Sequence, residues 1–378
     1  MDRRPPVRDG ADEADEQAIR MGHRASYVLI EDGAITAYYS HWGAKVAPAV
    51  VLGGFAETCA YLRALAPADG LLDTVWAEGG ILLDADTHTL RFWGGESLRD
   101  RPDLRRLFLP SVGRLWPGWA VAWATQGVVD FAEYPGVAQA LGQDPASRLD
   151  DDPEKWVPYS EAELLTPREE PWLATVLTVR WDDGGVADYT FDHDPPGYLT
   201  YGPELLGILR GRPPDALPRE DGDGQGNYPI GGAYADVPAR TLWLWVANTR
   251  HPAYGERVRQ AWPGWHVDEH VDSLAQQIRL SGRDPALVTT PRDRVIAELL
   301  DTVTNAMSWG EAFDPGAFVR QTMTPTEREA ATFAQGFFRV DRPPTPATPA
   351  QGREVLLNLL QRVSDEQALE QAHGSSGQ

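Results

Sequence analysis

Two stretches of the chain show the alternation of apolar and polar residues that is typical of half-buried β-strands. YVLIEDGAITAYYSHWG runs from Tyr27 to Gly43, and TVLTVRWDDGGVADYTFDHD runs from Thr175 to Asp194. In each stretch an acidic residue followed by glycine separates two alternating segments, and glycine readily adopts the positive φ that a tight turn requires. Both stretches therefore predict a β-hairpin.

Helical patterns follow each predicted hairpin. FAETCAYLRALA (55–66) and GPELLGILRG (202–211) each predict one helix. A second hairpin is expected around Thr89 in the first case and around Thr241 in the second. After it, each part of the chain shows the pattern of a helix, a short strand and a final helix.

An internal repeat organises these elements. The sequence Trp-Pro-Gly-Trp at residues 116–119 recurs at residues 262–265, and in both cases a glycine stands 17 residues beyond the last tryptophan. Upstream, the glycine pairs 79–80 and 231–232 precede Thr-Leu and a tryptophan at equal spacings. The repeat predicts an α+β fold with two diverged tandem copies of a β-β-α-β-β-α-β-α unit, related by a pseudo-twofold axis and followed by a helical C-terminal tail.

The repeat and the composition of the remaining stretches divide the chain into segments. The predicted order is a disordered N-terminal arm (1–21), the first copy (22–142), a linker (143–170), the second copy (171–284), a helical extension (285–340), a proline-rich spacer (341–350), a C-terminal helix (351–368) and a disordered tail (369–378). The sequence leaves open whether the C-terminal helix docks on its own chain or on another one.

The net charge of the chain indicates which classes of binding partner are expected. The sequence has 56 acidic and 34 basic residues, which gives a formal net charge of -22. This charge repels phosphate backbones and anionic lipids, so nucleic acid and membranes are not expected as partners. A basic protein partner suits the charge, although acidity can also serve solubility alone. The oligomeric state is not predicted.

The sequence also predicts a cytoplasmic location. Cys59 is the single cysteine, so no internal disulfide can form. The charged N-terminus lacks the apolar core of a signal peptide, and no apolar stretch reaches the length of a membrane-spanning helix. Together these features are typical of a soluble protein that works in a reducing compartment.

One histidine pattern suggests metal chemistry. His266, Glu269 and His270 match the spacing HxxEH, in which two histidines bind zinc and the glutamate acts as a base, provided that the segment is helical. The corresponding segment of the first copy, 120–124, alternates like a strand. On a strand, His266, Asp268 and His270 would share one face and Glu269 would point away. That face could bind a metal ion, or it could be an ordinary polar surface.

A second histidine pair follows from the repeat. His41 and His193 each stand 38 residues before the first glycine of the repeated glycine pair. At a seam between the copies they could form a metal or acid–base cluster together with Asp192 and Asp194. The alternative is that each histidine caps a strand end.

The chain contains 14 tryptophans. The repeated Trp-Pro-Gly-Trp is expected to be structural, since proline and glycine form a turn that two indole rings can clamp. Four tryptophans outside the repeat are candidates for a surface that contacts a partner. These four are Trp42, Trp156, Trp181 and Trp309.

Two hypotheses of function follow. No nucleotide-binding or nucleophile motif stands out, and neither catalytic residues nor a cofactor can be assigned. The favoured hypothesis is a cytosolic, non-catalytic protein that binds another protein through acidic and tryptophan-bearing surfaces, such as a bacterial immunity or regulatory protein. The alternative is a metal-dependent hydrolase with the His/Asp site at the seam between the copies.

Overall fold

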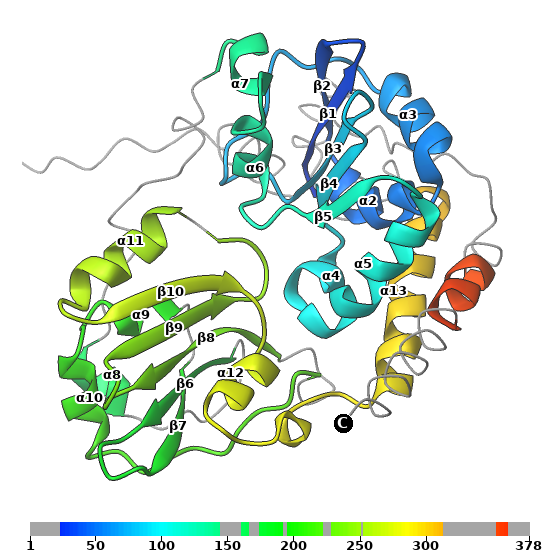
Figure 1. Cartoon of the computed structure of the whole chain (residues 1–378). Coiled ribbons are helices and arrows are strands. Elements are labelled where there is room, and N and C mark those ends of the chain that lie inside the picture. Colours follow the sequence, from blue (N-terminus) through cyan, green and yellow to red (C-terminus); the bar gives the residue numbers. More distant parts are fainter. Residues whose placement is uncertain are drawn as a thin grey trace, which may run out of the picture.

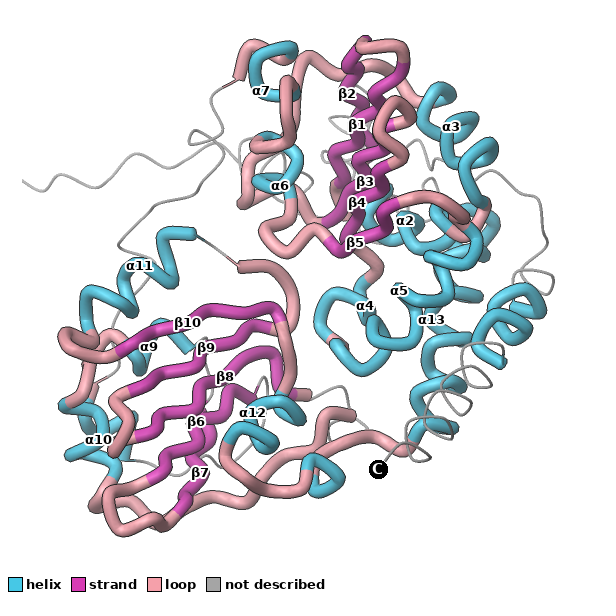
Figure 2. Tube along the Cα trace, viewed as in Figure 1, coloured by secondary structure: helices cyan, strands magenta, loops and turns pink. Residues whose placement is uncertain are grey.

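The computed structural model describes residues 23–143, 160–165, 174–191, 195–221, 228–250, 252–312 and 353–361. The protein is a mixed α+β structure with two five-stranded sheets (Figures 1 and 2). The first sheet contains β1 (Ala25–Glu31), β2 (Ala34–Ser40), β3 (Gly79–Asp84), β4 (Thr89–Trp93) and β5 (Ala120–Trp123). The second contains β6 (Ala174–Arg180), β7 (Val186–Phe191), β8 (Pro229–Asp236), β9 (Thr241–Val246) and β10 (His266–Val271).

The two sheets have the same topology. Their strand orders are β2-β1-β3-β4-β5 and β7-β6-β8-β9-β10. In each sheet the first strand along the chain pairs antiparallel with the second and parallel with the third. The third strand pairs antiparallel with the fourth, and the fifth pairs parallel with the fourth. The turn of the first hairpin has positive φ at Asp32 and Gly33, at 50° and 73°. Both hairpins expected at residues 27–43 and 175–194 are thus present.

Helices cover both sheets. The first half contains α2 (Gly43–Val51), α3 (Gly54–Ala64), α4 (Glu96–Asp100), α5 (Pro102–Leu115), α6 (Val128–Ala132) and α7 (Val137–Ala140). The second half contains α9 (Pro195–Leu199), α10 (Glu204–Leu209), α11 (Pro252–Ala261) and α12 (Leu274–Leu280). The short 3-10 helix η3 (Pro285–Leu287) and the long helix α13 (Arg292–Ala312) follow.

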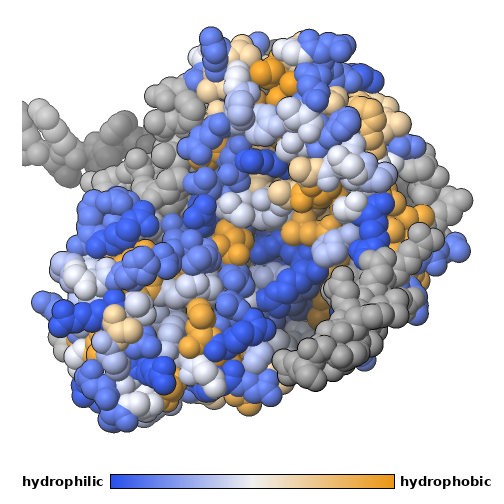
Figure 3. Space-filling model, viewed as in Figure 1, coloured by the Kyte–Doolittle hydropathy of each residue, from blue (hydrophilic) through white to orange (hydrophobic). Residues whose placement is uncertain are grey.

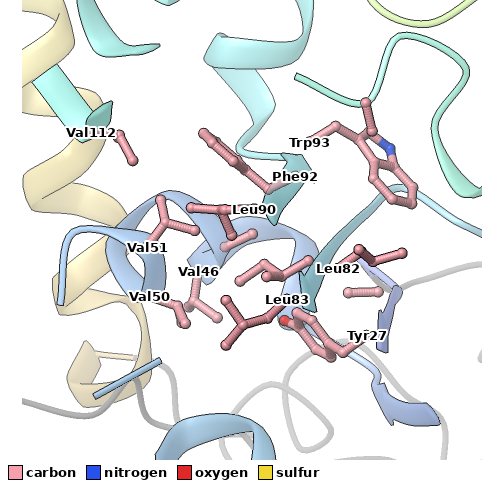
Figure 4. Packing of buried hydrophobic residues seen from close by; sticks show 14 of the residues in the cluster. Tyr27, Val46, Val50, Val51, Leu82, Leu83, Leu90, Phe92, Trp93 and Val112 are labelled. Carbon is pink, nitrogen blue, oxygen red and sulfur yellow. The ribbon is translucent and has the colours of Figure 1, made fainter. Parts of the chain in front are cut away.

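Each half has two helices between its hairpins where the sequence predicted one. The additional helix of the first half, α2, has a buried side chain at all but one of its positions and contains Pro48. A helix that is buried on all sides has no polar face, so it shows no amphipathic pattern in the sequence. Figure 4 shows side chains of α2 packed with those of β3 and β4, among them Val46, Leu83 and Leu90.

The repeated Trp-Pro-Gly-Trp sequences have the same structure in both halves. Trp116 Nε1 donates to the carbonyl oxygen of Val51, and Trp262 Nε1 donates to that of Leu199, both at 2.8 Å. In each motif the two indole rings meet edge to face, with centroids 5.0 Å apart in the first half and 4.8 Å apart in the second. Each motif therefore ties the end of the helix before β5 or β10 to the helix after the first hairpin.

Segments outside the two halves also pack on them. Helix α8 (Glu161–Leu165), in the predicted linker, inserts Leu164 into the core of the second half. The helical residues 353–361 lie beside α13 (Figure 1) and contribute Leu356 and Leu360 to the core of the first half. This helix thus docks on its own chain. The remainder of the predicted linker, spacer and tails lies outside the described residues.

Candidate binding face on the second sheet

Two arginines of α5 make contacts between the two halves, in addition to a main-chain hydrogen bond from Arg250 to Thr125 at 2.7 Å. Arg105 is buried, and its guanidinium donates to the carbonyl oxygen of Ala247 after β9 as well as to Leu98 O at 2.7 Å and Arg99 O at 2.5 Å. Burial lowers the pKa of Arg105 to about 10. All three acceptors belong to the main chain, so this arginine serves to fasten the halves together rather than to bind a ligand.

The carboxylate of Glu220 also takes part in the contact between α5 and the second half. The neighbouring Arg106 reaches the carboxylate of Glu220 at 3.4 Å and also contacts Ser273. Burial raises the pKa of Glu220, while the charge of Arg106 opposes that rise. The Glu220 carboxylate also accepts the main-chain N–H of Ala275 at 3.0 Å. Glu220 is therefore a buried structural residue.

Of the four residues of the predicted His/Asp site at the seam between the copies, the structure describes only His41. His41 follows β2, is buried, and has its Nδ1 3.0 Å from the hydroxyl oxygen of Tyr39. The matching residues Asp192, His193 and Asp194 lie outside the described residues. Strands β2 and β7, which precede the two sets, are edge strands on the sides of their sheets that face away from the other half (Figure 1). The pairing of the two histidines stays a prediction.

The four candidate surface tryptophans differ in their surroundings. Trp42 directly precedes α2, is only 7% exposed and packs edge to face on His41, so its assignment to a partner surface is wrong. Trp181 is half-buried beneath the guanidinium of Arg210, 4.8 Å from the ring centroid. Trp156 lies outside the described residues, and Trp309 belongs to α13 with a side chain that is not described. The rings of His23 and His41 both pack near Trp42, which explains its burial.

Residues 266–271 form a strand, as the comparison with the first copy predicted. His266, Asp268 and His270 are exposed on one face of β10, and Glu269 lies on the other. His266 Nε2 lies 3.0 Å from Asp268 Oδ2. This geometry does not place two histidines one helical turn apart, so the peptidase arrangement of HxxEH is absent. Among the described residues, no three His, Cys, Asp or Glu side chains are grouped to bind a metal ion.

The neighbouring strand adds an aromatic residue to this face. Trp243 of β9 is half-buried, and its ring stacks on that of His270 with centroids 5.3 Å apart and an interplanar angle of 24°. Sequence reasoning missed Trp243, although the alternation in TLWLWV places it on the same face as Trp245. Trp245 is fully buried in a cluster with residues of α12, whereas Trp243 lies at the margin of that cluster.

The equivalent face of the first sheet has a different chemistry. Ala120 pairs with Thr89 as His266 pairs with Thr241, so Ala120 and Ala122 stand where His266 and Asp268 stand in the second half. Both alanines are exposed. The fold therefore tolerates a methyl group at these positions and does not require an imidazole or a carboxylate. We call Trp243, His266, Asp268 and His270 the β9–β10 face.

The opposite face of β10 carries a buried carboxylate. Glu269 Oε1 is buried and has no hydrogen-bond partner. Burial raises the pKa of Glu269 to about 7, against the opposing effect of Arg250 and Arg259. Gly255 of α11 leaves room for this side chain, because a Cβ at that position would lie 2.2 Å from Glu269 Oε2.

Comparisons with known proteins found no matching family model, curated protein or solved structure. The class of the protein is thus defined by its own architecture, a mixed α+β chain with two similar five-stranded sheets. No helix in the described ranges combines the length and apolar character needed to cross a bilayer. On the face shown in Figure 3, hydrophilic side chains predominate and hydrophobic ones form smaller patches between them.

Proposed function

We propose that this protein is a non-catalytic binding protein whose partner is a protein with a basic surface, and that the β9–β10 face forms part of the contact. The observation that carries the proposal is the contrast between the two sheets. Positions that hold exposed Ala120 and Ala122 in the first sheet hold His266 and Asp268 in the second, beside the stacked Trp243 and His270. Tryptophan is among the residues most enriched where protein partners bind.

The chemistry of this face suits a protein partner. Trp243 offers a large, rigid apolar ring, while Asp268 offers a carboxylate that can pair with a lysine or arginine. The net charge of -22 would steer a basic partner towards the protein. A cytoplasmic immunity or regulatory protein of a bacterium would have these properties.

We also infer that the two halves arose by tandem duplication. Two features support this inference, namely the shared strand order and the equivalent hydrogen bonds of Trp116 and Trp262. A duplicated fold leaves one copy free to keep structural residues while the other acquires a binding surface. The difference between the two exposed sheet faces is what such a division would produce.

Quantitative binding with two matched variants tests the proposal. The partner is captured by cross-linking in the source cells and identified, and its affinity for the pure full-length protein is measured by calorimetry. Trp243→Ala should weaken binding by about tenfold or more, equal to about 1.4 kcal/mol. Arg91→Ala, at the equivalent position of the first sheet, should leave the affinity unchanged.

Two outcomes would contradict this proposal. Equal affinity of the Trp243→Ala variant and the unaltered protein would remove the β9–β10 face from the contact. Stoichiometric zinc or manganese in protein purified without a histidine tag, lost on His193→Ala, would favour the metal-dependent hydrolase with Asp192, His193 and Asp194 instead. The binding should also weaken as salt is raised, because salt screens the attraction between opposite charges.

A further inference from the structure

Two arginines flank Glu78 at one end of the first sheet. Arg24 directly precedes β1 and is only 7% exposed, and its guanidinium lies over the ring of Trp76, 4.6 Å from the centroid. Arg99 of α4 is half-buried and directs Nη1 to the carbonyl oxygen of Glu78 at 3.4 Å. The main-chain N–H of Glu78 donates in turn to the carbonyl oxygen of Arg24 at 2.8 Å. Both arginines therefore adjoin the same residue.

Both guanidinium groups have buried nitrogens without acceptors. Arg24 Nη2 and Arg99 Nε are buried and make no hydrogen bond. Neither side chain forms an ion pair with a carboxylate of the described residues. The Glu78 carboxylate is directed elsewhere, since it accepts the main-chain N–H of Arg24 at 3.1 Å and lies 3.7 Å from His23 Nδ1. The cluster thus has donors in excess of acceptors.

The guanidinium groups of the other buried arginines of the described chain each have at least one carboxylate or carbonyl acceptor, although Arg212 Nε also lacks a partner. Arg101 pairs with Asp103 at 2.7 Å, Arg212 pairs with Asp215, and Arg105 donates to three carbonyl oxygens. Removing a guanidinium from water without an acceptor is costly, and a cation–π contact recovers only a part of that cost. Among the buried arginines of the described residues, Arg24 is the one whose guanidinium has neither a carboxylate nor a carbonyl acceptor.

We propose that Arg24 and Arg99 bind an oxyanion, namely a carboxylate or phosphate group. The planar guanidinium presents paired N–H groups at the spacing of two oxygens of such a group. Stacking on Trp76 fixes the plane of Arg24, so little freedom is lost on binding. Arg99 is half-buried, so an anion from solvent can reach its guanidinium. This proposal goes beyond the contact of the β9–β10 face with a basic protein and is independent of it.

Calorimetric titration of the full-length protein tests the site, with sodium phosphate in one arm and sodium acetate in the other. Sodium chloride keeps the ionic strength constant. One anion should bind per chain, and Arg24→Ala should weaken that binding by about tenfold or more. Arg24→Lys should weaken it as well, because lysine keeps the charge but lacks the fork. Binding in the phosphate arm alone identifies a phosphate site, and binding in the acetate arm a site that takes carboxylates.

Arg210→Ala is the matched control. Arg210 also lies over a tryptophan, Trp181, but it has its own carboxylate partner in Asp182 at 3.2 Å. The control should bind the anion as the unaltered protein does. If Arg24→Ala fails to fold, as judged by circular dichroism, Arg99→Ala takes its place. No binding of either anion up to about 10 mM, or equal binding by the arginine variants and the unaltered protein, would overturn the proposal.

Discussion

Glu269 occupies the register position on β10 that Trp123 occupies on β5. Trp123 is buried beneath the guanidinium of Arg105, so the first half uses a large apolar ring there. The second half instead buries a carboxylate with one unpartnered oxygen, directly behind the β9–β10 face. A charged residue at a position where the same fold accepts tryptophan makes the local stability dependent on pH.

The direction of that dependence follows from the raised pKa. Burial raises the pKa of Glu269 from 4.5 to about 7, so the folded state binds the proton more tightly than the unfolded state. The stability from this proton is fully present below the unfolded value and is lost as the pH rises through 7. Between about pH 5 and pH 8 the free energy of unfolding of the unaltered protein should therefore fall by about 1–2 kcal/mol, with allowance for solvent access. Glu269→Gln should abolish this fall.

Urea unfolding across this pH range measures the effect. Glu204→Gln, at an exposed carboxyl in the first turn of α10, should leave the pH dependence as it is in the unaltered protein. If the unfolding free energies of the Glu269→Gln variant and the unaltered protein change equally with pH, Glu269 is not the titrating group.

At the scale of elements, both sheets depend on a glycine beneath a tryptophan. A Cβ at Gly80 would lie 2.2 Å from the carbonyl oxygen of Ser26 and 2.7 Å from the ring of Trp93. A Cβ at Gly232 would likewise lie 2.4 Å from Val176 O and 3.0 Å from the indole nitrogen of Trp245. The second glycine of each repeated pair is thus explained by close packing of a tryptophan over the neighbouring strand.

Alanine at either glycine should destabilise the protein strongly. Gly80→Ala and Gly232→Ala should each lower the free energy of unfolding by about 2–3 kcal/mol, because main-chain atoms must move to admit the methyl group. Gly113→Ala provides the control, since its Cβ would meet no atom within 4 Å and Gly113 lies inside α5. That change should instead stabilise by about 0.5–1 kcal/mol. Loss of stability on Gly113→Ala similar to the other two would contradict the packing argument.

The accuracy of sequence-based prediction also differed between elements. The helix expected before the short strand of the first half is present as α5, which has an apolar stripe and a proline at its first position. Helix α2 was missed because its uniform burial removes that stripe. The strand at 266–271 was predicted only through comparison with the first copy, because its own residues, HVDEHV, fit either a helix or a strand.

At the scale of the whole molecule, buried contacts of α5 join two halves that have separate hydrophobic cores. Arg105→Ala would leave the carbonyl oxygen of Ala247 without this donor and should cost about 2–4 kcal/mol. Scanning calorimetry should then resolve two unfolding transitions in place of one. Arg114→Ala, at the end of the same helix, should keep a single transition. A single transition in both variants would mean that other contacts couple the halves.

The candidate site was only partly predictable. The sequence showed that His266, Asp268 and His270 would share a face if the segment were a strand, and they do. It did not bring Trp243 to that face or Arg24 and Arg99 to Glu78, because these contacts are formed by neighbouring strands and by packing across long separations in the chain. Trp42 was assigned to the surface for the same reason, since its burial follows from tertiary packing near His23 and His41.

What the sequence determined by itself was local or repeated. Alternation and acidic-glycine turns specified the hairpins, and the recurrence of Trp-Pro-Gly-Trp indicated two similar halves, because these features depend on neighbours in the chain or on spacing alone. Tertiary structure decided which tryptophans are buried, which arginines lack acceptors and where Glu269 lies. Burial and electrostatic environment depend on atoms brought together from distant segments, and a linear pattern does not contain those distances.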